Sequence, residues 1–282
     1  MKKKHYTIFM FLSFLIGFSQ VESEQKQQTR SPFLFNPQNL DQNSKDLSAI
    51  YKVMADYYKG VEKANTTLLD KVFHTDWFMR DTETQHIGSL HIESKQKFIQ
   101  RVADHGPYHG YAKDRKFASI GLANDNIAFV RVNKTGATSF FLYKLDGEWI
   151  LMDKLWATID LDNTQRNGYE YSNVHELLHS YFEAVQNSNQ KMLNQLLHSA
   201  WDKKILNHQN NYSIIDKKTW LKNLKTNPYP SDPIKLVSTD LYNGKLAIVR
   251  VDFTEESTTT FFICFKMNGQ WTIAGERTTI GS

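Results

Sequence analysis

Five histidines lie between residues 74 and 109, and histidine is the commonest side chain in metal sites. They are His74, His86, His91, His105 and His109. His86 and His91 are five residues apart, so on a regular strand their side chains point to opposite faces. His105 and His109 share a loop segment with no Cys, Asp or Glu at a ligand spacing. The pattern therefore predicts no metal site, and we expect no cofactor.

The chain contains a single cysteine, Cys264, which excludes an intramolecular disulfide. It lies in the apolar run FFICF, where a cysteine behaves as a small hydrophobic residue. A reactive thiolate needs a polar or cationic setting. We therefore expect Cys264 to be buried in a strand and to have no catalytic part.

The elements that must position any site occur twice. Residues 50–77 align without a gap to residues 174–201, so that Tyr57 falls on Tyr181, His74 on His198 and Trp77 on Trp201. Apolar residues align with apolar ones between these identities. The chain is therefore two copies of one module. We expect the first domain at 44–160, a linker at 161–172 and the second domain at 173–282.

Each copy shows helical periods first and strand signals afterwards. A buried stripe at i, i+3, i+4 and i+7 spacing predicts a helix beginning near Ser44, and a short second helix follows. Ser94 and Asp216 occupy equivalent places and predict the N-cap of a third helix in each copy. Asp146-Gly147 and Asn268-Gly269 between apolar runs predict hairpins. This order of elements indicates the α+β class.

The N-terminus has the pattern of an export signal. Basic residues at 2–4 precede a 13-residue apolar run at 6–18, and small residues stand before a cleavage site after Ser19, with Ser23 as an alternative end. The run is shorter than the roughly 20 residues that cross a bilayer. Residues 1–19 are therefore interpreted as a signal peptide and 20–43 as a flexible tether. We expect the mature protein to be exported, periplasmic or extracellular, without membrane attachment.

The charge balance argues against nucleic acid as a partner. Removal of Lys2, Lys3 and Lys4 with the leader takes the 34 basic residues to 31, which face 30 acidic ones. Proteins that bind nucleic acid usually carry a clear basic excess gathered on one face. No run of Lys or Arg remains in the mature chain.

The Tyr-rich first helix, the segment FHTDW (73–77) and the hairpin segment DGEWILMDKLW (146–156) resemble the nuclear transport factor 2-like superfamily. Within it, they are most similar to the putative lumazine-binding (SnoaL-like) branch, here as a tandem repeat. The resemblance implies two cone-shaped modules, each with three helices packed on a strongly curved antiparallel sheet around an apolar pocket. It also implies pairing of cones through their sheets, as an internal pseudo-dimer and, in addition, a possible homodimer.

The ketosteroid isomerases of this superfamily suggest where chemistry would occur. By this resemblance, Tyr57 falls where they keep a catalytic tyrosine and Asp81 where they keep the carboxylate that moves the proton. Phe141 stands where they keep a second acid for the oxyanion, and the loss of one such donor typically costs ~10²–10³ in rate. The second copy has Ile205 in place of Asp81. The resemblance leaves enzyme activity open and favours binding without catalysis.

The leading hypothesis is an exported protein that binds a small apolar or aromatic ligand in its first domain, with a mainly structural second domain. The expected lining is Tyr57, Trp77, Asp81, Phe98, Phe141 and Trp156. One alternative is a cofactor-independent lyase or isomerase that uses Asp81 and Tyr57. Another is a protein-interaction module whose sheet faces hold a partner.

Overall fold

The computed structural model describes residues 43–82, 89–111, 116–134, 136–157, 167–224, 234–253 and 257–281. The predicted signal peptide, all but the last residue of the predicted tether, and the first half of the predicted linker lie outside the described residues. The described part of the chain begins with a helix at Asn43.

The first domain begins with three helices and the strands between them. These are α2 (Asn43–Glu62), α3 (Thr66–Val72), β1 (Phe73–Thr82), β2 (His91–Ser94) and α4 (Lys95–His105). Four strands follow, namely β3 (Lys116–Ala123), β4 (Ile127–Lys134), β5 (Gly136–Leu145) and β6 (Glu148–Ala157). The predicted order of helices and strands is confirmed.

The second domain repeats this order. Its helices and first strands are α5 (Asn167–Gln186), α6 (Gln190–Leu196), β7 (Leu197–Asn207), β8 (Tyr212–Asp216) and α7 (Lys217–Asn223). Its hairpin strands are β9 (Ile234–Tyr242), β10 (Leu246–Phe253), β11 (Thr258–Met267) and β12 (Gln270–Ile280). Helix α5 begins at Asn167, inside the segment interpreted as linker, and Glu170 in its first turn binds Lys266 and Trp271.

The predicted helix caps and hairpin turns are present. The side chains of Ser94 and Asp216 accept hydrogen bonds from the backbone N–H groups of Lys97 and Thr219. Asp146 has a φ of 51° and Gly147 a φ of 83°, the left-handed pair that a two-residue hairpin turn requires. These local signals set the element boundaries in both copies.

Each domain contains one six-stranded sheet, with the order β2-β1-β6-β5-β4-β3 in the first and β8-β7-β12-β11-β10-β9 in the second. The α+β class is confirmed, and one detail of the expected antiparallel sheet is corrected. Strand β1 runs parallel to β6, and β7 runs parallel to β12, so both sheets are mixed. The parallel pair is formed across α4 and four strands, β2 to β5, which lie between β1 and β6 in the chain.

Strands β6 and β12, the last in the sequence of each domain, each contain a bulge that determines which face their side chains point to. In β6, Leu142 is opposite Leu151 while Phe141 is opposite Asp153, so Met152 is an extra residue. The residues after it are shifted to the opposite face from the one that simple alternation predicts. Lys154 and Trp156 consequently face the helices, and Asp153 and Leu155 face away from them.

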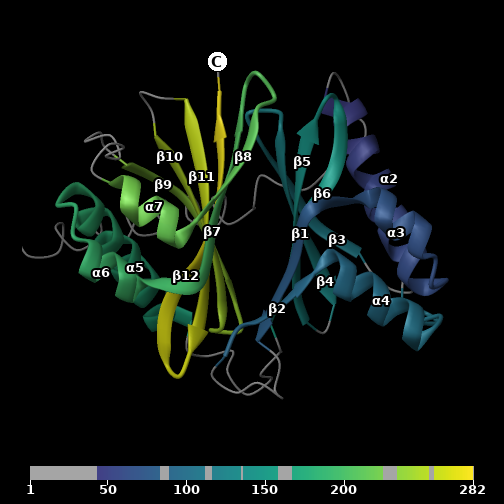
Figure 1. Cartoon of the computed structure of the whole chain (residues 1–282), viewed down its shortest axis with the longest axis horizontal. Coiled ribbons are helices and arrows are strands. Elements are labelled where there is room, and N and C mark those ends of the chain that lie inside the picture. Colours follow the sequence, from purple (N-terminus) through teal and green to yellow (C-terminus); the bar gives the residue numbers. More distant parts are fainter. Residues whose placement is uncertain are drawn as a thin grey trace, which may run out of the picture. The chain divides into compact units, whose positions relative to one another are not determined.

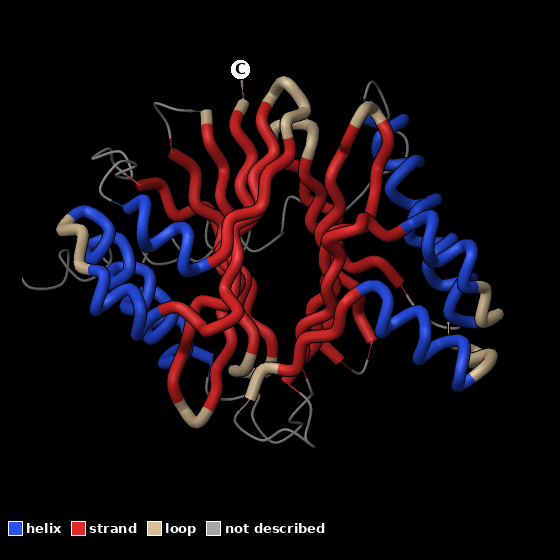
Figure 2. The backbone as a smooth tube through the Cα atoms, viewed as in Figure 1, coloured by secondary structure: helices blue, strands red, loops and turns tan. Residues whose placement is uncertain are grey.

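The helices cover one face of each sheet, here called the helix side, and the other two faces pack together (Figures 1 and 2). Sixteen buried residues from both domains form the cluster between the sheets, among them Phe129, Phe141 and Leu155 from one and Phe261 and Ile263 from the other. Cys264 lies on the helix side of its sheet, buried as predicted, and burial raises the pKa of its thiol.

Five charged residues lie inside this contact and form the interdomain charge cluster: Arg80, Asp153, Asp202, Lys204 and Arg277. Asp153 accepts hydrogen bonds from Arg80 at 2.9 Å, from Arg277 at 2.6 and 2.7 Å and from Lys204 at 3.2 Å. Asp202 accepts from Arg80 at 2.5 Å and from Arg277 at 3.1 Å. Burial, only partly offset by Asp153, lowers the pKa of Lys204 to about 8.

Gly275 is the residue of β12 that corresponds to Asp153 of β6. A Cβ atom at Gly275 would lie 3.0 Å from Asp202 Oδ1 and 3.1 Å from Arg277 Nη1. The charge cluster therefore occupies the space of a side chain at this position. It is built around one carboxylate from β6 and leaves room for none from β12.

Candidate functional site

The helix side of the first domain is filled by aromatic side chains. Tyr57 of α2 is fully buried, and its ring contacts those of Phe73, Phe98 and Phe140 at centroid distances of 5.9, 6.4 and 5.3 Å. Trp77 of β1 stacks on Phe73 at 4.3 Å. The structure thus brings together Tyr57, Trp77 and Phe98, three of the residues predicted from the sequence.

The hydroxyl groups and one cation of this region form a chain of polar atoms. Tyr57 Oη lies 3.1 Å from Tyr111 Oη, and Lys154 Nζ lies 3.5 Å from the same Tyr111 oxygen. Lys154 Nζ is also 5.6 Å from the centre of the Phe98 ring. The ammonium group of Lys154 therefore lies beside the Phe98 ring and the Tyr111 hydroxyl, which in turn contacts the hydroxyl of Tyr57.

Lys154 is 9% exposed. Among the residues that the structure describes, no carboxylate forms an ion pair with it. A buried ammonium without a counter-charge costs several kcal/mol, at order-of-magnitude level, unless another group neutralises it. Its nearest described hydrogen-bond partner is a neutral phenol at the outer limit of hydrogen-bond length. Within the described ranges, Lys154 therefore has one long hydrogen bond and no carboxylate partner.

Asp81 of β1 is fully buried on the same side of the sheet. In the pairing of β1 with β6, Asp81 is opposite Trp156, and Met79 is opposite Lys154. Asp81 therefore lies two residues further along the strand than the position of Lys154. Its Oδ2 lies 3.0 Å from His91 Nδ1, while Oδ1 has no hydrogen-bond partner among the described residues. The contacts thus join Asp81 to His91 and Tyr57 to Tyr111, in two separate pairs.

Phe141 does not lie with the other predicted lining residues. It belongs to the cluster between the two sheets, where its ring is 5.3 Å from that of Phe261. Its neighbour Phe140 faces the helices instead. The placement of Phe141 in the pocket is corrected accordingly, because β5 alternates and presents the odd-numbered aromatic residues to the other domain.

In the second domain, the polar residues at the corresponding positions pair with one another. Tyr181, which corresponds to Tyr57, donates a hydrogen bond of 2.6 Å to Glu276, and Lys203 Nζ lies 3.3 Å from the other oxygen of that carboxylate. Glu276 occupies the β12 position that corresponds to Lys154, and Lys203 the β7 position that corresponds to Met79. The second domain therefore supplies an internal carboxylate where the first supplies a cation.

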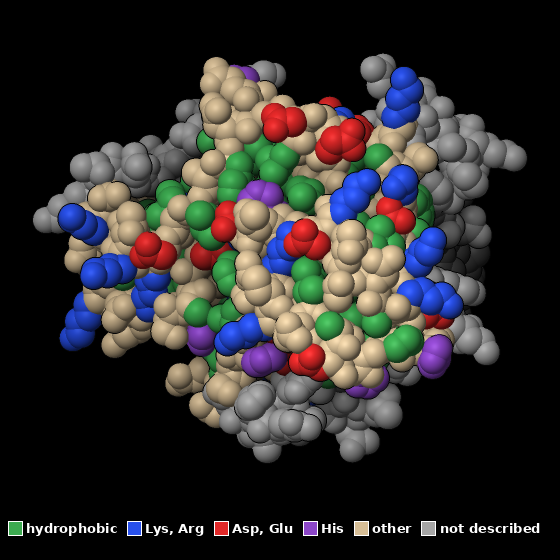
Figure 3. Space-filling model, turned by 45° about the vertical axis from the view of Figure 1, so that its right-hand side comes forward, with side chains coloured by type: hydrophobic (Ala, Val, Ile, Leu, Met, Phe, Trp, Pro, Cys, Tyr) green, Lys and Arg blue, Asp and Glu red, His purple; other side chains and the backbone are tan. Residues whose placement is uncertain are grey.

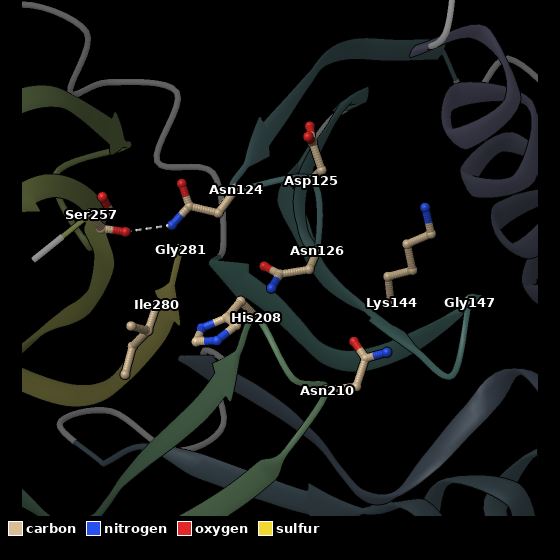
Figure 4. A pocket seen from close by; sticks show the side chains of 10 residues that line it. All are labelled: Asn124, Asp125, Asn126, Lys144, Gly147, His208, Asn210, Ser257, Ile280 and Gly281. Carbon is tan, nitrogen blue, oxygen red and sulfur yellow. Dashed lines mark hydrogen bonds between the residues drawn. The ribbon is translucent and has the colours of Figure 1, made fainter.

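A different pocket, of about 530 Å³, lies where turns of both domains meet (Figure 4). Its lining is mostly polar and comprises Asn124, Asp125, Asn126, Lys144, Gly147, His208, Asn210, Ser257, Ile280 and Gly281. Asn124 donates a hydrogen bond of 2.8 Å to the carbonyl oxygen of Ser257, and Asn126 accepts one from Thr279. Two of its asparagines thus connect the domains.

In the aromatic site on the helix side of the first domain, the sequence analysis did not identify Lys154 and Tyr111. The available signal was a lysine within the apolar strand segment EWILMDKLW. Simple alternation from Trp149 and Leu151 would place Lys154 on the opposite face. The bulge at Met152 reverses that assignment, and nothing in the residue types announces it.

No group of three or more histidine, cysteine, aspartate or glutamate side chains among the described residues could hold a metal ion. None of the described helices is both long and apolar enough to cross a membrane. On the face shown in Figure 3, acidic and basic side chains lie close to one another among hydrophobic ones.

Solved structures that are similar to this chain each match one domain's length. An NTF-2 like protein of unknown function from Silicibacter pomeroyi is 15% identical with a TM-score of 0.35, covering 41% of this chain and 98% of its own. One from Shewanella baltica is 19% identical with a TM-score of 0.37, covering 43% and 99%. A ketosteroid isomerase-like protein from Erwinia carotovora is 11% identical with a TM-score of 0.32, covering 41% and 98%.

No curated protein sequence matches this chain significantly. The family model described as "Putative lumazine-binding" matches it twice, at residues 45–157 and at residues 169–276. Each match spans one set of three helices and one six-stranded sheet. The chain therefore belongs to the putative lumazine-binding family and contains the domain of that family twice in tandem.

Proposed function

We propose that this protein binds a small aromatic molecule on the helix side of the first domain, and that the second domain is mainly structural. The observation that carries the proposal is the difference between the two copies. Glu276 contacts both Tyr181 and Lys203 in the second domain, whereas the buried Lys154 of the first contacts a phenol, Tyr111, and the ring of Phe98. Aromatic walls with a few convergent polar groups are typical of ligand sites.

The family description names lumazine, a flat bicyclic compound with carbonyl oxygens and ring N–H groups. A flat ring system suits the rings of Tyr57, Phe98 and Trp77, and its polar edge suits hydroxyl and ammonium donors. Lumazine is therefore the first ligand to test.

Titration of the full chain with lumazine, followed by its fluorescence, should give saturable binding. Tyr57→Phe should weaken binding roughly 5–30-fold, because it removes one hydrogen-bonding hydroxyl worth about 1–2 kcal/mol. Tyr181→Phe is the matched control at the same place in the second domain. It should leave binding unchanged and lower stability instead. Equal effects of the two variants on binding would contradict the assignment of the site to the first domain.

A lyase or isomerase remains the second candidate, and one observation favours it. Asp81 is fully buried next to His91 with one carboxylate oxygen that has no described partner, an arrangement suited to accepting a proton. Asp81→Asn keeps the shape of the side chain and removes the base. If the bound ligand is released chemically unchanged by both the wild type and this variant, binding without catalysis stands.

The third candidate, an interaction module, would use the sheet faces that the helices do not cover. Those faces pack on each other in the cluster that contains Phe141 and Phe261. This contact supports the ligand-binding proposal over a partner protein held on the same surfaces.

Export is part of the proposal and rests on the N-terminal pattern. Intact-mass measurement of the protein from its own source should show a chain that begins at Gln20, or at Glu24 if cleavage follows Ser23. A mature chain that begins at Met1 would contradict export through this signal.

A further inference from the structure

Lys154 and Glu276 occupy corresponding places in the last strand of each sheet, directly after the residue that follows the bulge. Both project to the helix side, where Glu276 contacts Tyr181 and Lys154 contacts Tyr111, the neighbour of Tyr57. In the second domain the polar centre of this region is a carboxylate that receives a 2.6 Å hydrogen bond from the tyrosine and pairs with a lysine at 3.3 Å. In the first domain the cation and the phenols are present, and the chain supplies no described carboxylate to join them.

We infer that the ligand of the first domain carries an acidic group, of the carboxylate class, attached to an aromatic body. This inference rests on the proposed function and specifies the chemistry of its ligand. The anion would lie against Lys154 Nζ and the hydroxyl of Tyr111, close to Tyr57. It would take the part that the Glu276 side chain plays in the second domain.

Burial is the first physical reason. Lys154 is nine-tenths buried, so water solvates its charge poorly, and an anion that neutralises it relieves that desolvation cost. A phenol cannot do so, because it offers a dipole and no charge. Hydrogen bonds to charged groups also contribute more than hydrogen bonds between neutral groups.

Shape is the second reason. The ammonium group lies 5.6 Å from the centre of the Phe98 ring, and that ring also contacts Trp77 at 5.1 Å and Tyr57 at 6.4 Å. An anion at Lys154 is therefore adjacent to aromatic rings. An acid group carried on a flat ring suits both the ammonium group and the aromatic rings beside it.

The neighbouring carboxylate does not oppose this assignment. Asp81 faces the same side of the sheet, but it is two residues further along β1 and opposite Trp156. Its Oδ2 is already held by His91 at 3.0 Å. The acid group of the ligand and Asp81 thus belong to different ends of the site.

The test uses two probes that share one ring system, 2-naphthoate and its neutral amide, 2-naphthamide. Calorimetric titration of the wild-type full chain should show at least tenfold tighter binding of the naphthoate, with a difference that shrinks as salt is added. Lys154→Met keeps the length of the side chain and removes its charge. It should weaken naphthoate roughly 10–150-fold and change naphthamide by less than about twofold.

Two further variants test whether the effect belongs to the charge at position 154. Lys144→Met removes the lysine of the pocket in Figure 4 and should not change naphthoate binding. The double variant Met79→Lys with Lys154→Glu copies the Lys203–Glu276 pair of the second domain into the first. It should keep the fold, because the same pair is accommodated there, and should abolish naphthoate binding.

The outcomes separate the inference from the proposed function. Equal affinity for the two probes, or unchanged naphthoate affinity in a folded Lys154→Met variant, overturns the acidic ligand and leaves aromatic binding in place. Failure of lumazine and of both naphthalene probes to bind the wild type overturns the proposed function and the inference with it. Should Lys154→Met not fold, the ratio of the two probes and its salt dependence on the wild type decide the question.

Discussion

Replacing Asp153 with alanine is expected to lower the free energy of unfolding by about 3–5 kcal/mol, the usual cost of removing one partner from a buried ion pair. Asp153 accepts hydrogen bonds from Arg80, Lys204 and Arg277, and all three cations are at most 2% exposed. Without it, only Asp202 remains to balance them. Urea denaturation followed by tryptophan fluorescence measures the change.

Asp240→Ala provides the matched control. Asp240 forms an ion pair of 2.8 Å with Arg131 across the same pair of domains, but both side chains are about a third exposed. Exposed pairs typically contribute about 1 kcal/mol or less. If Asp153→Ala costs no more than Asp240→Ala, the interdomain charge cluster contributes little to stability.

The same residue should give the protein part of its acid sensitivity. Burial would raise the pKa of Asp153, but Arg277, Lys204 and Arg80 outweigh burial and hold the pKa below its ordinary value of 3.8. The folded protein thus binds fewer protons here than the unfolded chain, so stability rises with pH. This contribution is present above pH 3.8 and is lost as the pH falls below it. Asp153→Asn should flatten the dependence of stability on pH between about pH 5 and pH 2.

Replacing Glu276 with alanine is the second change with a large expected effect. Glu276 is fully buried, accepts the hydrogen bond of Tyr181 and pairs with Lys203, which is 8% exposed. Its removal leaves a buried ammonium beside an apolar core, and we expect a loss of about 3–5 kcal/mol. Thermal or urea unfolding of the full chain gives the value.

Lys154→Ala is the comparison for Glu276→Ala, because the two residues occupy corresponding positions. Removal of Lys154 takes away a charge that no described carboxylate neutralises, so the loss should be small, about 1 kcal/mol or less. A similar loss for both variants would show that Lys154 is satisfied within the folded chain. The inference that the second domain neutralises its buried charge internally, and that the first does not, would then be wrong.

The architecture of each domain could be predicted because its signals are local. Ser94 and Asp216 cap helices, Asp146-Gly147 turns a hairpin, and the stripe containing Tyr57 defines one helix face. The parallel contact of β1 with β6 could not be predicted in this way. It joins residues such as Phe78 and Asp153, which are far apart in the chain and carry no mutual signal.

The site was predicted in part for the same reason. Tyr57, Trp77 and Phe98 could be chosen because each lies on a face defined by its own helix or strand. Lys154 was missed and Phe141 misplaced because their facing depends on which sheet surface meets the other domain and on a bulge at Met152. A single extra residue changes the face of every side chain after it.

The interdomain charge cluster has a consequence for recognition between copies of this fold. A twofold symmetric pair must place the same residue at both equivalent positions. Here Asp153 corresponds to Gly275, and Arg277 corresponds to Leu155, so each half holds what the other lacks. Two second domains facing each other would confront four cations with two carboxylates. The tandem arrangement thus permits an asymmetric contact, in which the second domain is matched to the first and mismatched to a copy of itself.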